Sequence, residues 1–175
     1  GLRCAARLRR LHPAWDIQVI EQREVFSYGA CGLPYVLSGD IEDPSELRRT
    51  SYGLLRDVPF FADAKGIEVL ASTRALSVDA AARTLEVEGP GGRQSLSWDE
   101  LVLATGARAV RLPGQPDDER ICGFHEITDL PPLRQGLMRG AISRAVIVGA
   151  GLVGCELAEA FRSIWGAEVA LVEAG

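Results

Sequence analysis

A glycine-rich motif near the end of the chain constrains the fold more than any other feature. Residues 144–148 (Arg-Ala-Val-Ile-Val) have the apolar pattern of a buried strand, and residues 149–154 (Gly-Ala-Gly-Leu-Val-Gly) follow directly and open an amphipathic helix. Residues 168–172 predict a second strand, which leads to Glu173, 19 positions after Gly154. Strand, G-x-G-x-x-G loop, helix, strand and acid occur here in the order of a dinucleotide-binding βαβ unit.

Each glycine of this loop has a physical task in such a unit. Gly149 allows the tight turn, Gly151 lets the backbone approach a pyrophosphate, and Gly154 permits close packing of the helix on the strand. The helix N-terminus turns its free N–H groups and positive dipole end towards the phosphates. Glu173 can accept a hydrogen bond from a ribose 2′-hydroxyl but repels a 2′-phosphate, which predicts a preference for NADH over NADPH.

The start of the chain repeats the last part of this pattern. Gly1 opens an amphipathic helix that is expected to run to about Leu11, and residues 16–20 form a strand pattern that leads to Glu21, 20 positions after Gly1. Taken alone, these residues also fit an unrelated amphipathic helix followed by a strand. Matched to residues 154–173, they predict that Gly1 is the third glycine of a first dinucleotide fingerprint whose strand is missing.

Two dinucleotide units in one chain predict an α/β fold with two Rossmann-like domains, one for FAD and one for NAD(P)H. Residues 111–119 carry two prolines and three consecutive acids, the composition of an exposed linker. We therefore expect an FAD-binding domain over residues 1–112 and an NAD(P)-binding domain over residues 113–175. Because a doubly wound sheet needs further strands on either side, both domains are expected to be incomplete and the chain to be a fragment.

Short β-rich runs alternate with turns between the two units. They predict a small antiparallel meander in the first domain, which leads into a buried strand at residues 101–104. The expected strands of the meander are residues 67–70, 75–78, 84–88 and 95–98. Residues 45–65 are expected to be helical, with Phe60 and Phe61 packing inwards as core side chains.

Composition excludes several classes of function. A net charge of -5 and a pI near 5.1 argue against non-specific nucleic-acid binding, which needs a basic surface. No apolar run approaches the roughly 20 residues that cross a bilayer, and the N-terminus lacks the pattern of a signal peptide, so we expect no membrane association and a cytoplasmic location. Four scattered cysteines without a Cys-x-x-Cys pair, and two histidines, predict neither a metal site nor a disulfide framework.

Cys31 is the candidate for single-thiol chemistry. Pro34 is tolerated only in the first turn of a helix, which places Cys31 at a helix N-terminus. There the free N–H groups and the helix dipole favour the thiolate, which is the reactive form. A free cysteine is more commonly a small buried hydrophobe. Gly29 and Gly32 on either side indicate instead that something approaches the backbone closely, which favours a reactive Cys31.

The run Ser27-Tyr-Gly-Ala-Cys31-Gly-Leu-Pro-Tyr35, together with the two glycine units, resembles the single-cysteine branch of the FAD- and NAD(P)-dependent disulfide oxidoreductases. Within that branch it is most similar to the coenzyme A-disulfide reductases. The resemblance implies that NAD(P)H reduces FAD, that the flavin reduces a mixed disulfide of Cys31, and that the substrate is a small coenzyme A-type disulfide or persulfide. It also implies a homodimeric parent protein. An NADH oxidase or peroxidase of the same family, and an isolated fragment without activity, are the alternatives.

The resemblance and the glycine units together assign binding residues. Those at the cofactors are Gly1, Glu21, Gln22, Ala75, Ala104, Thr105, Gly106, Gly149, Gly151, Leu152, Val153, Gly154 and Glu173. Those at a phosphate-bearing substrate are Arg3, Arg7, Arg10 and Ser27. The three arginines form one stripe at i, i+4 and i+7 along the first helix, for which an ordinary solvated face is the alternative. Ala30 stands where the coenzyme A-disulfide reductases usually have asparagine, and Gly53 lies near the place of a lysine, so the thiol substrate stays open.

Overall fold

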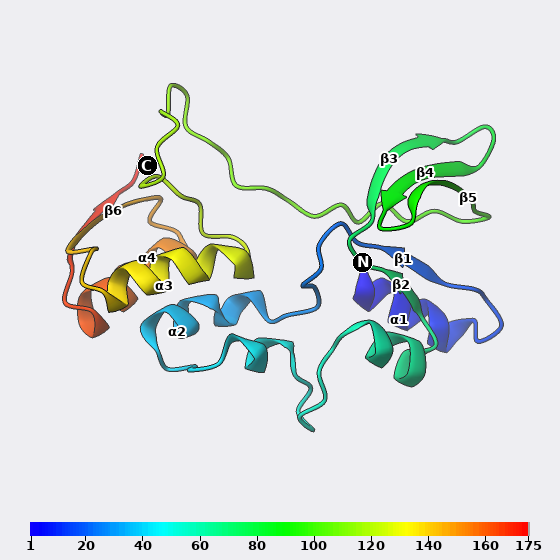
Figure 1. Cartoon of the computed structure of the whole chain (residues 1–175), viewed down its shortest axis with the longest axis horizontal. Coiled ribbons are helices and arrows are strands. Elements are labelled where there is room, and N and C mark those ends of the chain that lie inside the picture. Colours follow the sequence, from blue (N-terminus) through cyan, green and yellow to red (C-terminus); the bar gives the residue numbers. More distant parts are fainter. Residues whose placement is uncertain (175) are drawn as a thin grey trace. The chain divides into compact units, whose positions relative to one another are not determined.

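The computed structural model describes residues 1–174, which form two compact units. The first comprises residues 1–28 and 48–107, and the second comprises residues 29–47 with the chain from Arg108 onwards. Each unit contains one parallel pair of strands (Figure 1). No helix within residues 1–174 has the length and apolar character needed to cross a membrane. The division into domains between residues 112 and 113 stays a prediction for the whole protein.

The first unit begins with helix α1 (Leu2–Leu11), which confirms the helix predicted to open at Gly1. Strand β1 (Gln18–Ile20) follows and pairs in parallel with β2 (Glu68–Leu70). Burial of apolar side chains from these segments holds α1 and the strand pair together. The buried cluster consists of Ala5, Phe26, Phe61, Ile67 and Val69, with Phe60 partly buried against it.

A separate antiparallel sheet has the strand order β3-β4-β5 (Figure 1). Its strands are β3 (Arg74–Asp79), β4 (Thr84–Gly89) and β5 (Gly92–Ser97). The predicted meander is therefore confirmed for these three strands. It is wrong for residues 67–70, because β2 is not part of the meander. This strand pairs in parallel with β1, about 50 residues earlier in the chain.

The helix predicted over residues 45–65 is wrong in its middle part. Its two ends are helical, as a 3₁₀ turn (Pro44–Arg48) and a π-helical turn (Phe60–Ala64). Between them the backbone turns at Gly53, whose φ of 79° is incompatible with a right-handed helix. Asp57 then starts the second helical piece, because its carboxylate accepts the N–H of residue 60 at 3.0 Å.

Residues 101–104 do not form the buried strand that the sequence predicts. Their backbone is irregular, and the side chains of Val102 and Leu103 are 57% and 73% exposed. A strand needs a neighbour to satisfy its N–H and C=O groups, and no strand within residues 1–174 pairs with this segment. Residues 111–119 are mostly exposed, lack regular secondary structure and belong to the second unit, and their role as a linker between domains stays a prediction.

The second unit contains the parallel pair β6 (Arg144–Val148) and β7 (Glu168–Val172), in register along their whole length. Helix α4 (Leu152–Glu159) and the π-helical turn Ala160–Ile164 connect the two strands. This order of strand, glycine loop, helix and strand confirms the prediction for the second dinucleotide unit. Alternate side chains of β6 differ in burial: Ile147 is partly buried, whereas Val146 is 69% exposed.

Helix α2 (Leu33–Ser38) belongs to the second unit too, and a 3₁₀ turn (Ala30–Gly32) leads into it. It packs against α4, against the π-helical turn that follows α4, and against α3 (Leu130–Met138), itself preceded by the 3₁₀ turn Ile127–Asp129 (Figure 1). The helices of the second glycine unit therefore hold the segment that carries Cys31.

Candidate functional site

The loop at residues 149–154 has the backbone geometry that its glycines predict. Gly149 has a φ of 107°, which residues with a side chain rarely adopt. A Cβ atom on Gly154 would lie 1.8 Å from the carbonyl oxygen of Gly149, so only glycine lets α4 approach the loop this closely. A Cβ atom on Gly151 would meet nothing within 4 Å, which leaves room for a ligand beside the backbone. The loop fits a pyrophosphate in these respects.

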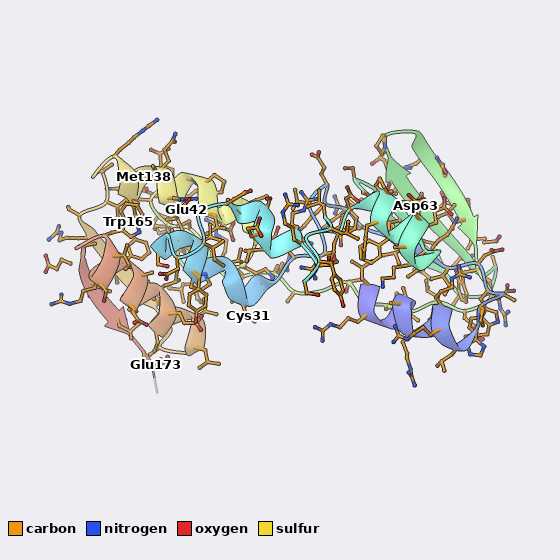
Figure 2. The ribbon with its side chains drawn as sticks, turned by 90° about the horizontal axis from the view of Figure 1, so that it is seen from below. Cys31, Glu42, Asp63, Met138, Trp165 and Glu173 are labelled. Carbon is orange, nitrogen blue, oxygen red and sulfur yellow. The ribbon has the colours of Figure 1, made fainter. Side chains whose placement is uncertain are left out.

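Glu173 lies beside this loop, at the end of β7 (Figure 2). Its Oε2 atom accepts the N–H of Ala150 at 2.6 Å. Leu152 and Val153 are exposed and lie in the first turn of α4. The structure thus brings the acid, the glycines and the helix start together, as the sequence predicts for a site that faces a ribose and a pyrophosphate.

The residues predicted around a first dinucleotide also meet in part. Gly1 is the N-cap of α1, and a Cβ atom built on it would lie 3.6 Å from the Cβ of Ala104. Residues 104–106 are exposed, and Gly106 has a φ of 73°. The predicted flavin-contacting segment therefore lies beside the helix start that would face the flavin phosphates.

Glu21 directly follows β1, as the sequence predicts for a ribose-binding acid. Its Oε1 accepts the N–H of Arg23 at 3.0 Å, and the Arg23 guanidinium lies 3.7 Å from the same oxygen. Gln22 next to it is exposed. Ala75, the remaining predicted contact, lies on the exposed strand β3 of the antiparallel sheet rather than on the β1–β2 pair.

Cys31 is exposed and lies in the 3₁₀ turn that enters α2 (Figure 2). Pro34 occupies the first turn of α2, as predicted, and is buried. The thiol therefore lies at the start of a helical segment and within reach of solvent and of a dissolved disulfide. Cys31 is therefore not buried, and its redox role stays a prediction.

The close neighbour that the sequence predicts for the backbone beside Cys31 is found at Gly32. A Cβ atom on Gly32 would lie 2.2 Å from Cδ2 of Leu47, so the close neighbour of this backbone is a side chain of the same chain. The N–H of Gly29 donates to the carbonyl oxygen of Leu47 at 2.8 Å. Leu47, which is buried, thus fixes the turn that carries Cys31.

The basic stripe is exposed along its whole length: Arg3, Arg7 and Arg10 all project from α1 into solvent. Arg9 behaves differently, because its guanidinium donates to the carbonyl oxygens of Pro13 and Gly66 and ties the end of α1 to the loop before β2. Ser27 is partly buried and has a left-handed φ of 57°. The stripe and Ser27 belong to the first unit and Cys31 to the second, so the structure does not bring them together within one compact unit.

Asp118, Arg120 and Cys122, all in the second unit, have shifted pKa values. Hydrogen bonds from Arg120 hold the pKa of Asp118 well below its usual range, and the same pair raises the pKa of Arg120. Partial burial and the nearby Asp129 carboxylate raise the pKa of the Cys122 thiol, although the residue as a whole is exposed. A raised pKa makes Cys122 a poorer nucleophile near neutral pH.

The four cysteines are free thiols. Among residues 1–174, no group of three or more His, Cys, Asp or Glu side chains is arranged to hold a metal ion.

Sequence reasoning did not predict two hydrogen bonds, one to α2 and one to the segment that follows it. The indole Nε1 of Trp165 donates to the carbonyl oxygen of Leu37 at 2.8 Å, and Nη1 of Arg134 donates to the carbonyl oxygen of Glu42 at 2.7 Å. Both pairs are about a hundred residues apart in the chain, and no local sequence pattern indicates such a bond. They attach the cysteine-bearing segment to the second glycine unit.

Comparisons with known proteins identify the architecture. The profile of the pyridine nucleotide-disulphide oxidoreductase family matches residues 1–175. The chain belongs to this family. The resemblance inferred from the motifs is confirmed, and so is the α/β fold with its Rossmann-type units.

Relatives of the chain include enzymes of the expected kind. It is 33% identical over 168 residues to the NAD(P)H coenzyme A polysulfide/persulfide reductase of Pyrococcus horikoshii, covering 93% of this chain and 35% of that protein. It is 28% identical over 178 residues to an NADH oxidase of Lactococcus lactis, covering 99% of this chain and 38% of that protein. The structure of an NAD-dependent persulfide reductase from A. fulgidus superposes with a TM-score of 0.91 at 33% identity, covering 98% of this chain and 31% of that one. The chain spans about a third of the length of these relatives.

Proposed function

We propose that the whole protein is a flavin-dependent NAD(P)H:disulfide oxidoreductase, and that Cys31 is its redox-active thiol. The proposed substrate is a small coenzyme A-type disulfide or persulfide. The observation that carries the proposal is the exposed Cys31 at the entry of α2, in a unit that also holds a complete glycine loop with its acid. The names of the persulfide reductases among the relatives support the substrate class.

The two nucleotide sites follow from the glycine units. Gly149, Gly151, Gly154 and Glu173 would hold NAD(P)H, because the loop leaves space beside Gly151 and the carboxylate lies at its edge. Gly1, Glu21 and residues 104–106 would hold part of FAD in the first unit. When bound, these two cofactors supply the two electrons of the reduction.

The chemistry proposed for Cys31 balances with one disulfide and two electrons. The Cys31 thiolate attacks one sulfur of R–S–S–R, forms the mixed disulfide Cys31–S–S–R and releases the other half as a thiolate. Two electrons then cleave the mixed disulfide, restoring the Cys31 thiolate and releasing the second half. With NADH as reductant, the sum is one disulfide, one NADH and one proton giving two thiols and NAD⁺. A persulfide gives one thiol and hydrogen sulfide in the same way.

A second candidate is an NADH oxidase, which the L. lactis relative favours by name. The two candidates differ in the species that accepts electrons, which is oxygen for the oxidase and a sulfur–sulfur bond for the reductase. Oxidation of NADH in air without added disulfide distinguishes them. A homodimeric state and a cytoplasmic location stay predictions under either candidate.

The decisive experiment replaces Cys31 by serine in the full-length protein. Cys31→Ser is expected to abolish disulfide-dependent NADH oxidation, because a hydroxyl cannot form the mixed disulfide, while flavin absorbance is retained. Cys4→Ser is the matched control, since Cys4 is also exposed but lies on α1. Unchanged disulfide turnover in Cys31→Ser would rule out the assignment.

A further inference from the structure

The position of the Cys31 thiol depends on how α2 is held. This helix has six residues, and isolated helices shorter than about 12 residues are marginal in water. Its stability must therefore come from tertiary contacts. Val36 and Leu37 are completely buried in these contacts, whereas Cys31 at the entry of the helix is exposed.

The C-terminal end of α2 is secured through its carbonyl groups. The last carbonyls of a helix have no partner within the helix and need one from elsewhere. The carbonyl oxygen of Tyr35 accepts the Ser38 hydroxyl and the Ile41 N–H, each at 3.0 Å. The carbonyl oxygen of Leu37 accepts the indole N–H of Trp165 at 2.8 Å. Because Leu37 is 0% exposed, bulk water cannot replace the indole at this oxygen.

Trp165 itself comes from the helical segment that begins at the second glycine loop. It follows the π-helical turn Ala160–Ile164, which continues α4. Behind it, Gly166 turns the chain with a φ of 67°, and its N–H donates to the carbonyl oxygen of Arg162 at 3.1 Å. The indole is therefore presented from a well-fixed helix end, and Figure 2 shows Cys31 and Trp165 on the segments that this bond joins.

From these contacts we propose that Trp165 is a positioning residue for the redox thiol: its hydrogen bond to Leu37 anchors α2 and so holds Cys31 where it reacts. The inference rests on the proposed function of Cys31. Trp165 does not touch the thiol, because it acts at the opposite end of α2. Its role differs from that of a packing residue, since a side chain of the same shape without the N–H would leave the buried Leu37 oxygen without its donor.

Two variants of the full-length protein separate the bond from the packing. Trp165→Phe removes the donor and part of the ring. Benzothienylalanine at position 165 keeps the indole shape and replaces N–H by sulfur, which guards against a packing defect in the first variant. Trp15→Phe is the matched control, because Trp15 is a partly exposed tryptophan of the first unit that stacks on His12.

The first readout is the rate at which Cys31 forms a mixed disulfide with Ellman's reagent. The extent of this reaction is measured on the proteolytic peptide that contains Cys31, with the peptide that contains Cys4 as the reference. Loss of one buried hydrogen bond is expected to lower the reaction rate of Cys31 about three- to tenfold and to leave the reaction rate of Cys4 unchanged. The second is steady-state turnover of coenzyme A disulfide with NADH, in which kcat is expected to fall by a similar factor while KM stays within about twofold.

The outcomes separate this inference from the proposed function. Equal Cys31 rates and equal kcat in wild type and both variants would overturn the positioning role. So would faster reaction at Cys31, or slowing shared by Cys4, which would indicate a general loss of structure. If the wild-type protein does not reduce disulfides with NADH, the proposed function is wrong. If the variants still lower the rate at which Cys31, but not Cys4, reacts with Ellman's reagent, the positioning role is supported independently.

Discussion

Gly151 and Gly154 lie only three residues apart in the second loop, but replacing each by alanine is predicted to have a different effect. One change is expected to lower stability and the other to lower nucleotide affinity. In Gly154→Ala, the new Cβ would lie 1.8 Å from the Gly149 carbonyl oxygen and 3.0 Å from its carbonyl carbon. In Gly151→Ala, the new Cβ would meet nothing within 4 Å, and the φ of -68° is open to any residue. The first change therefore affects the fold, and the second affects only what binds beside the loop.

The expected loss of stability in Gly154→Ala follows from the atom that the new Cβ would meet. A backbone oxygen cannot rotate away as a flexible side chain could, so α4 must move from the loop. Overpacking of this kind costs about 1–3 kcal/mol or more, and the gain of alanine over glycine in a helix, about 1 kcal/mol, offsets only part of it. A net loss of about 1–2 kcal/mol corresponds to a fall in Tm of about 2–8 °C for a domain of about 150–250 residues.

Gly151→Ala is expected to change Tm little, because its only penalty is a less favourable helix N-cap, worth up to about 1 kcal/mol. Its Cβ would instead occupy the space through which a pyrophosphate approaches the backbone, and the affinity for NADH is expected to fall about tenfold or more, equivalent to about 1.4 kcal/mol.

Thermal unfolding and NADH titration of both variants, as full-length proteins, test the pair. An unchanged Tm in Gly154→Ala would refute the steric argument for that position. Unchanged NADH affinity in Gly151→Ala, with an intact fold, would show that the nucleotide does not approach this part of the loop.

The remaining predictions concern the charged residues of the two units. Glu173 at the loop is expected to give the whole protein a higher kcat/KM with NADH than with NADPH, and Glu173→Gln, which removes the charge, is expected to narrow the difference; a wild-type preference for NADPH would contradict this role. Arg7→Ala combined with Arg10→Ala is expected to raise KM for coenzyme A disulfide about tenfold or more, because arginine–phosphate hydrogen bonds contribute roughly 1.5–3 kcal/mol each when partly desolvated. Small uncharged disulfides should be turned over as before, and equal losses on both substrates would indicate a structural role for the stripe.

The features that the sequence alone determined are those with a local physical cause. The glycine loop is recognisable because Gly149 and Gly154 are needed for steric reasons that involve only neighbouring residues. Helix α1 and the β3–β5 meander follow from the periodicity of short segments and from the turns between them. Pro34 likewise placed Cys31 at the entry of a helix, because a proline fits only the first turn.

Tertiary structure decided the features that depend on partners far along the chain. Residues 67–70 joined β1 rather than the meander, a choice between strand neighbours that no local pattern encodes. The close neighbour of Gly32 proved to be Leu47, and the donor for the buried Leu37 oxygen is Trp165, 128 positions away. A buried carbonyl must find a donor wherever the folded chain supplies one, so its partner is set by the packing of whole helices and not by the residues beside it.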